Sequence, residues 1–323
     1  MTRLRTVSCQ EPGWRRIRCG RGFRYVDQDG AALDDDAVAR IRDLAIPPAW
    51  TKVWICPDDR GHLQAVGTDD AGRRQYIYHP VWREKRDAAK FERVVEMARK
   101  LPRVRKKLRE AMSGPPTGYG QVLATAVHLI DLGCFRPGAE VYAEENGSYG
   151  LTTLERRHMR KEGDARVFCF VGKAGVDHEV RVVDADVCRV LDAVTRGRRP
   201  GSHLLSARED GRWRSLNAAD INGHIGDLFG MEVTAKDFRT WHATVTVAVA
   251  LAEAPRAASR PARTQQMRAA IAEAAELLGN SPAVARSSYV DPRVLDRFES
   301  GQTVGRHKGR TAYEAAVVRL LGG

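Results

Sequence analysis

Apolar and polar residues alternate in short runs over about the first 80 residues, the period of two that half-buried β-strands show. Such runs lie at residues 23–26, 53–55, 63–66 and 75–78. Between them, Val38, Ile41 and Leu44 share the spacing of a helix face, and one of the aspartates at positions 34–36 can cap its start. This part of the chain is therefore predicted to be β-rich with one short helix.

The spacing changes to that of helices near Glu84. Apolar residues recur three or four apart from Phe91 to Leu101, and Pro102 is expected to end that helix. Another helix is predicted over residues 121–132, and later helices begin near Asp186, Asn217 and Thr234. Two alternating runs at residues 167–171 and 179–182 predict a hairpin, and residues 255–261 have the composition of a linker.

The chain of 323 residues is long enough for two domains. We expect an α+β protein with a small β-rich N-terminal domain over residues 1–85. A larger, mainly α domain with one short β-hairpin follows over residues 86–323. The longest nearly apolar run, residues 243–252, is far shorter than the ~20 residues of a membrane span. Charged residues also interrupt the N-terminal segment, so neither membrane insertion nor a signal peptide is expected.

The chain is strongly basic. It has 53 Lys and Arg against 41 Asp and Glu, a formal net charge of +12. Basic residues gather with aromatic ones at residues 14–25 and 73–78, and a third basic cluster follows at residues 100–109. Each cluster alone fits a solvated basic face equally well, but three of them in a basic chain favour nucleic acid as the partner.

The sequence lacks the motifs of nucleotide binding, and its carboxylates and cysteines do not form the patterns of metal sites or disulfides. No phosphate-binding G-x-x-x-x-G-K-[ST] loop occurs, so no nucleotide cofactor is expected. The nearest carboxylate groups, at residues 34–36 and 184–186, stand where helix caps are expected, so no metal is expected either. The six cysteines form no C-x-x-C pair, which favours reduced thiols over a zinc site or disulfides.

Five segments stand out together. They are Phe135-Arg136-Pro137-Gly138, residues 171–178 with Lys173, residues 236–241 with Arg239, residues 278–282 with Asn280, and residues 287–292 with Tyr289. In this order they resemble the type IB DNA topoisomerases, specifically the short poxvirus-like form of bacteria. The resemblance runs from about Trp14 to Pro292 and includes a Tyr142-x-x-Glu145-Asn146-Gly147 segment. It implies the fold shared by tyrosine recombinases and these topoisomerases.

The resemblance also implies a role for each residue. Arg136 and Arg239 would give charged, forked donors to the non-bridging phosphate oxygens, and Pro137 would hold Arg136 in an extended turn. Lys173, at a hairpin tip, would be the general acid for the leaving 5′-oxygen. Tyr289 would be the nucleophile.

One position departs from the common pattern. Asn280 stands where viral and nuclear members commonly carry His, and an amide can donate a hydrogen bond but cannot carry a proton at neutral pH. The position therefore suits oxyanion stabilisation rather than general-base catalysis. Asn280 could also serve the start of the helix at Ser281-Pro282.

Four further residues are expected to contact DNA. Gln75, Tyr76 and Tyr78 match family positions at the major groove and backbone, although the two tyrosines could instead pack on one face of a strand. Lys236 either contacts a phosphate or balances Asp237. Lys236-x-x-Arg239 stands where tyrosine recombinases usually have His-x-x-Arg, which favours the topoisomerase branch.

The function implied is ATP-independent relaxation of supercoiled duplex DNA through a 3′-phosphotyrosyl intermediate. The enzyme would be a bacterial monomer acting on duplex DNA without any cofactor, cytoplasmic and associated with the nucleoid. The alternatives are a tyrosine site-specific recombinase, which needs tetramer assembly, and a non-catalytic DNA-binding protein.

Overall fold

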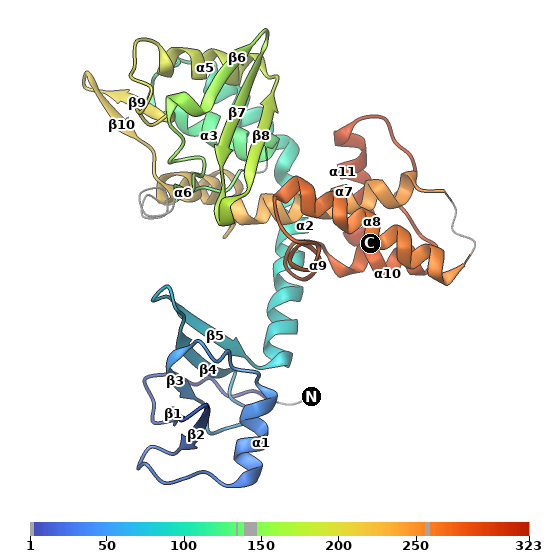
Figure 1. Ribbon diagram of the computed structural model, residues 1–323. Helices are drawn as coiled ribbons and strands as arrows, with labels where there is room; N and C mark the ends of the chain where they lie inside the picture. The colour runs from blue at the N-terminus through green and yellow to red at the C-terminus, as the bar shows by residue number, and fades with distance from the viewer. Residues whose placement is uncertain (1–2, 134, 139–146, 256–258, 323) are drawn as a thin grey trace. The chain divides into compact units, whose positions relative to one another are not determined.

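A computed structural model describes residues 3–133, 135–138, 147–255 and 259–322. The chain divides into two compact units, Met1–Lys90 and Phe91–Gly323 (Figure 1). The predicted boundary between residues 85 and 86 and the boundary of the units both fall within one continuous helix, α2 (Pro80–Met112). The first unit is built on a sheet and the second mainly on helices, so the α+β class is confirmed.

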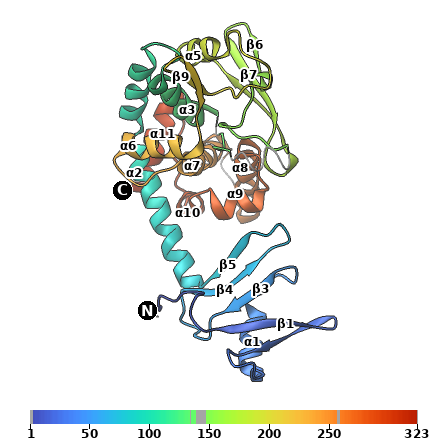
Figure 2. The same ribbon diagram turned by 90° about the vertical axis from the view of Figure 1, so that its left-hand side faces the viewer.

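Within residues 3–90, five strands form one antiparallel sheet in the order β2-β1-β3-β4-β5 (Figure 2). Their bounds are β1 (Trp14–Cys19), β2 (Gly22–Val26), β3 (Thr51–Ile55), β4 (Leu63–Thr68) and β5 (Arg74–Tyr78). The predicted helix is α1 (Asp35–Asp43), and Asp34 caps it by accepting a hydrogen bond from the Ala37 N–H.

The sheet of the first unit buries apolar side chains on both faces. Ile41 of α1 packs with Val53, Ile55 and Ala65 in one cluster. Residues of opposite parity on the same strands, such as Val66, join a second cluster with Val7. Because successive side chains of a strand point to opposite faces, this alternation is the reason the strand pattern was legible in the sequence.

The first helix of the helical unit runs past the proline that was expected to end it. Pro102 lies inside α2, and the buried face continues beyond it through Val104, Leu108 and Met112. A proline inside a helix costs roughly 3 kcal/mol or more, because it removes a hydrogen bond and crowds the preceding turn. Burial of about 1.5–3 kcal/mol per large apolar side chain offsets that cost here.

One apolar core runs through the second unit, with Trp241, Phe168 and Phe238 among its largest fully buried side chains. The helices around it are α3 (Tyr119–Gly133), α5 (Ala185–Thr195), α6 (Ala218–Phe229), α7 (Ala235–Glu253), α8 (Arg260–Leu278), α9 (Pro282–Ser288), α10 (Pro292–Glu299) and α11 (Arg310–Gly322). A three-stranded sheet has the order β6-β7-β8, with β6 (Met159–Glu162), β7 (Ala165–Val171) and β8 (Asp177–Val182). A two-stranded sheet pairs β9 (Ser206–Glu209) with β10 (Arg212–Ser215).

The local signals of the second unit are confirmed at the helix starts. Asp184, Asn217 and Thr234 are the N-caps of α5, α6 and α7, the last two in capping boxes. The hairpin of β7 and β8 also forms, but β6 joins it as a third strand that the sequence pattern had not indicated. Residues 259–261 begin α8 rather than continue a linker, while Tyr142, Glu145 and Asn146 lie outside the described residues.

The apolar stretches are those of a packed core. In the described part of the chain, none of the helices combines the length and the apolar character that crossing a membrane requires.

Candidate active site

Arg136 follows α3 in a segment whose backbone is fixed by a second stretch of chain. The Leu151 and Thr152 N–H groups donate to the carbonyls of Arg136 and Pro137 at 2.8 and 2.7 Å. Gly138 (φ +98°) packs so closely on Gly150 that a methyl group on either would collide with the other's backbone. The arginine therefore begins from a rigid support, as the extended turn before Pro137 requires.

Arg239 comes from the second turn of α7 and is only 4% exposed. Its Nη2 donates to the carbonyl oxygen of Leu278, the last residue of α8, at 2.7 Å. Arg136 reaches the same helix end, with its Nη2 3.3 Å from the Gly279 oxygen and 3.4 Å from the Leu278 oxygen. The last carbonyls of a helix have no partner within it and form its negative pole, so they hold both guanidinium groups.

The end of α8 also sets the position of Asn280. Gly279 takes the left-handed conformation (φ +57°), and the N–H groups of Gly279 and Asn280 donate to the Glu276 and Ala275 carbonyls. This Schellman arrangement turns the chain sharply. The Asn280 Oδ1 then accepts from Arg136 Nη2 at 2.7 Å, while its Nδ2 is buried with no partner in the described ranges.

Tyr289 ends the short helix α9, which Ser281 caps and Pro282 begins, as the sequence predicted. The guanidinium carbon of Arg239 lies 5.5 Å from the centre of the Tyr289 ring, within the range of a cation–π contact. The short helix α9 thus brings Tyr289 to the residues held by the end of α8.

Thr244 of α7 fixes the backbone around Tyr289, a role that the sequence analysis missed. Its hydroxyl donates to the Tyr289 carbonyl at 3.3 Å and accepts from the Asp291 N–H at 3.1 Å. Thr244 is 1% exposed and lies five residues after Arg239 on one helix. A threonine within an apolar helix carries no sequence signal of such a bond, because its partners lie 45 and 47 residues away.

A cavity of about 580 Å³ opens beside this cluster, and Arg136, Arg239 and His178 line it. Burial, and next the like charge of Arg239, lowers the pKa of Arg136, although Tyr289 opposes the shift. Arginine remains charged despite such shifts, so the cavity offers permanent positive charge to an anionic group. Glu273 and Glu276 of α8 lie on the same wall.

Lys173 stands on the hairpin of β7 and β8. It is exposed in the 3-10 turn Lys173–Gly175 that joins β7 to β8, where Gly175 has a φ of +74°. Gly172, directly before it, lines the cavity with both arginines. The structure thus joins Arg136, Arg239, Asn280 and Tyr289 directly, and Lys173 stands on the neighbouring hairpin.

The four residues expected to contact DNA come from two elements, β5 and α7. Lys236 is exposed in the first turn of α7, and its neighbour Asp237 pairs with Arg93 at 2.9 Å. Gln75, Tyr76 and Tyr78 are on β5 of the first unit. Tyr76 is 46% exposed and its ring stacks on Tyr78 with centres 6.1 Å apart, while the Gln75 amide donates to Asp69 at 2.9 Å.

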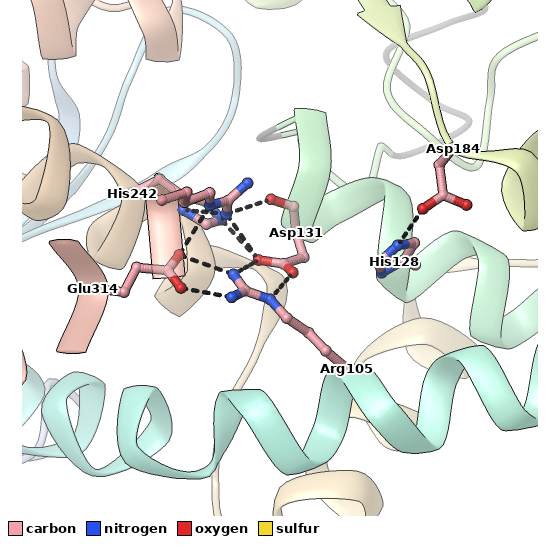
Figure 3. Close-up of polar contacts among 7 residues, drawn as sticks. Arg105, His128, Asp131, Asp184, His242 and Glu314 are labelled. Carbon is pink, nitrogen blue, oxygen red and sulfur yellow. Dashed lines mark hydrogen bonds and ion pairs between the residues drawn. The ribbon is translucent and has the colours of Figure 1, made fainter. Parts of the chain in front are cut away.

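The core also holds a cluster of charged side chains that the sequence analysis did not predict. Arg105 of α2 reaches Asp131 of α3 at 2.6 Å and also pairs with Glu314 of α11, and His242 of α7 lies 3.2 Å from Asp131 (Figure 3). Arg310 completes this buried ion network at 3.1 Å from Asp131. Arg105 belongs to the third basic cluster of the sequence, and its side chain is in a structural ion pair rather than on a solvated basic face.

Among the described residues, no three His, Cys, Asp or Glu side chains gather as the ligands of a metal ion do.

Charged donors at a tyrosine, on an α+β fold with a strongly basic sequence, define a class of enzyme that acts on the phosphodiesters of DNA. Residues 79–308 match the family described as eukaryotic DNA topoisomerase I, catalytic core. Residues 22–69 match the bacterial DNA topoisomerase IB N-terminal domain. The chain belongs to the type IB DNA topoisomerase family, in its bacterial form, and has the activity of a type I DNA topoisomerase.

Viral relatives cover most of the chain. DNA topoisomerase 1B of Acanthamoeba polyphaga mimivirus is 29% identical over 287 residues, which are 86% of this chain and 84% of the viral protein. DNA topoisomerase 1B of Vaccinia virus (strain Copenhagen) is 25% identical over 81% of this chain and 82% of its own length. DNA topoisomerase 1 of Schizosaccharomyces pombe is 27% identical over 53% of this chain and 20% of its own.

Proposed function

We propose that Tyr289 is the nucleophile with which this topoisomerase cuts one strand of duplex DNA. Its phenolic oxygen forms a bond to phosphorus while the bond from phosphorus to the 5′-oxygen breaks. The phenolic proton passes to solvent, and Lys173 gives a proton to the leaving 5′-oxygen. The observation that carries the proposal is the convergence of Arg136, Arg239 and Asn280 with Tyr289 at the end of α8.

Arg136 and Arg239 bind the non-bridging oxygens of the scissile phosphate, where negative charge increases during the attack. Each guanidinium carries five N–H donors, so a bond to an α8 carbonyl and a bond to a phosphate can coexist on one arginine. The Asn280 Nδ2 supplies a further, neutral donor, because the Asn280 Oδ1 already accepts from Arg136.

The cut strand remains joined to the protein as a 3′-phosphotyrosyl ester with a free 5′-hydroxyl. Rotation of the nicked duplex releases supercoils, and the 5′-hydroxyl then attacks the ester and restores the phosphodiester. The ester conserves the energy of the broken bond, so relaxation needs no nucleotide cofactor.

In this proposal the first unit also binds the duplex, as a DNA-clamp domain. Gln75, Tyr76 and Tyr78 contact DNA from β5, where Arg74 lies 6.0 Å over the Tyr76 ring, and Lys236 contacts a phosphate from α7. We place the enzyme on the bacterial nucleoid as a monomer.

Incubation with supercoiled plasmid in EDTA, without ATP, tests the proposal. We expect relaxed plasmid, and a covalent protein–DNA adduct when the reaction is stopped with denaturant. Binding without an adduct would identify a non-catalytic DNA-binding protein, whereas an adduct formed only by tetramers, with strand exchange, would identify a recombinase. Light scattering of the active sample gives the oligomeric state.

A further inference from the structure

One imidazole lies between the two segments that carry Lys173 and Asn280. His178 is on β8, directly opposite Phe170 of β7, and stacks on that ring with centres 5.2 Å apart. A methyl group built on Gly172 would lie 2.5 Å from His178 Cδ2, and one built on Gly279 would lie 2.5 Å from His178 Cε1. The imidazole therefore fills the space between these two glycines.

Each glycine directly precedes a residue of the proposed site. Gly172 comes before Lys173, and Gly279 comes before Asn280. Gly172 is buried and its N–H donates to the Val176 carbonyl at 2.7 Å, which closes the hairpin turn. Gly279 makes the left-handed turn that directs Asn280 toward Arg136. A shift of the imidazole would change the distance between the two segments.

The charges around His178 favour its neutral form. Burial lowers the pKa of His178, and the positive charges of Arg136 and Arg239 lower it further, while Asp177 on its own strand opposes them. Glu179, Glu273 and Glu276 line the same cavity. A neutral ring can pack beside two arginines without adding a third positive charge to the site.

We propose that His178 is a positioning residue, which holds the hairpin carrying Lys173 at a fixed distance from the end of α8 that carries Asn280. This rests on the general-acid role proposed for Lys173. Misplacement of a reacting group by about 1 Å can cost roughly 10²-fold in rate, so the packing of one ring can matter as much as a direct contact.

The test separates proton donation from the other steps. An alkoxide leaves poorly without a proton, whereas a thiolate leaves readily because thiol pKa values are near ~8.5. A DNA strand with sulfur at the 5′-bridging position therefore makes the general acid unnecessary. Single-turnover cleavage of this strand and of an ordinary strand is measured for each variant.

We expect His178→Ala to slow cleavage of the ordinary strand by up to about 10²-fold and to cleave the sulfur strand near the wild-type rate. Lys173→Ala should show the same rescue, and His178→Ala should add no further loss to Lys173→Ala. Equal losses of His178→Ala on both strands, or losses that multiply in the combined variant, would overturn the proposal.

A second variant keeps the test valid if His178→Ala does not fold. Gly172 has extended backbone angles (φ −94°, ψ −168°) that any residue adopts, so Gly172→Ala only adds a methyl group against the imidazole. It should slow cleavage of the ordinary strand and cleave the sulfur strand near the wild-type rate, and neither measurement needs the His178→Ala protein. Gly223→Ala, which adds a methyl group to open space on α6, is the matched control. An unchanged rate of Gly172→Ala on the ordinary strand would count against His178 as a positioning residue.

Failure of the proposed function gives a different result. If Lys173→Ala gains nothing from the sulfur, Lys173 is not the general acid. His178 is then judged by the combined variant alone, where non-additive losses still support positioning of the hairpin and additive losses exclude it.

Discussion

The Arg136 Nη2 donates to the Asn280 Oδ1 at 2.7 Å, which joins the segment after α3 to the segment after α8. The bond leaves the Asn280 Nδ2 to donate elsewhere, and that nitrogen has no partner within the residues described. One amide can therefore orient an arginine and also bind a phosphate oxygen.

Asn280→Ala should slow single-turnover cleavage by roughly 10²–10³-fold, the usual effect of losing one oxyanion donor, while both arginines remain. Asn280→His should be tolerated better, because an imidazole can also donate. Asn280→Asp keeps an acceptor for Arg136 but loses the donor, so it should cleave as slowly as the alanine variant. If Asn280→Ala cleaves at the full rate, Asn280 is not a phosphate donor and only helps to form the turn between α8 and α9.

Tyr289→Phe should abolish the covalent adduct and plasmid relaxation while leaving DNA binding nearly unchanged. The change removes one hydroxyl and no charge, and it keeps the ring that Arg239 contacts. Adduct formation is measured on a denaturing gel and binding by filter retention. Tyr313→Phe is the matched control, since that hydroxyl donates to Glu253 at 2.7 Å, and it should still form the adduct. Relaxation by Tyr289→Phe would move the nucleophile to another tyrosine.

Thr244→Val should slow cleavage by up to about 10²-fold, because it releases the backbone on both sides of Val290. It should also lower stability by roughly 1–3 kcal/mol, since the Asp291 N–H is left buried and unpaired. Thr244→Ser retains the hydroxyl and should restore most of the rate, measured by single-turnover cleavage. Thr246→Val, on the same helix, is the control and should change little. Equal cleavage rates of Thr244→Val and Thr244→Ser would contradict the role of the Thr244 hydroxyl.

The buried ion network should make the fold sensitive to acid. Burial alone would raise the pKa values of Asp131 and Glu314, but hydrogen bonds from His242 and Arg105 to Asp131, and from Arg105 to Glu314, lower both. Carboxylates with depressed pKa values stabilise the fold above about pH 4, and that stability is lost as the pH falls through the depressed values. Burial also lowers the pKa of His242, so the unfolded chain takes up its proton first as the pH falls below about 6.5.

We therefore expect the free energy of unfolding to fall steadily from pH 7 to pH 3, as measured by denaturant titration at each pH. Asp131→Asn should cost up to about 3–5 kcal/mol at pH 7, because it removes one of the two buried carboxylates that pair with Arg105 and Arg310, and the difference from wild type should shrink in acid. Glu110→Gln, which removes an exposed partner of Lys106, is the control and should change stability little. If Asp131→Asn lowers the free energy of unfolding by the same amount at every pH, Asp131 is not the charged carboxylate proposed here.

The sequence determined those parts of the protein that depend on neighbours along the chain. Aspartate, asparagine and threonine are the N-caps of α1, α5, α6 and α7. At a helix start, the free backbone N–H groups are satisfied by side chains only three residues away in the sequence. The alternation of β3 and β4 and the Gly279 turn before Asn280 are likewise local. So are the motif segments from which the family could be identified.

Tertiary structure alone decided the rest, because the deciding contacts join residues far apart in sequence. Burial of one face carries α2 through Pro102, and Arg105 leaves the basic surface to pair with Glu314, 209 residues later. Arg310 and Glu314 lie beyond residue 308, where the match to the family ends, yet they complete the network on α7, the helix of Arg239. Thr244, His178 and the carbonyls of α8 act through packing and backbone bonds, which leave no pattern in the sequence.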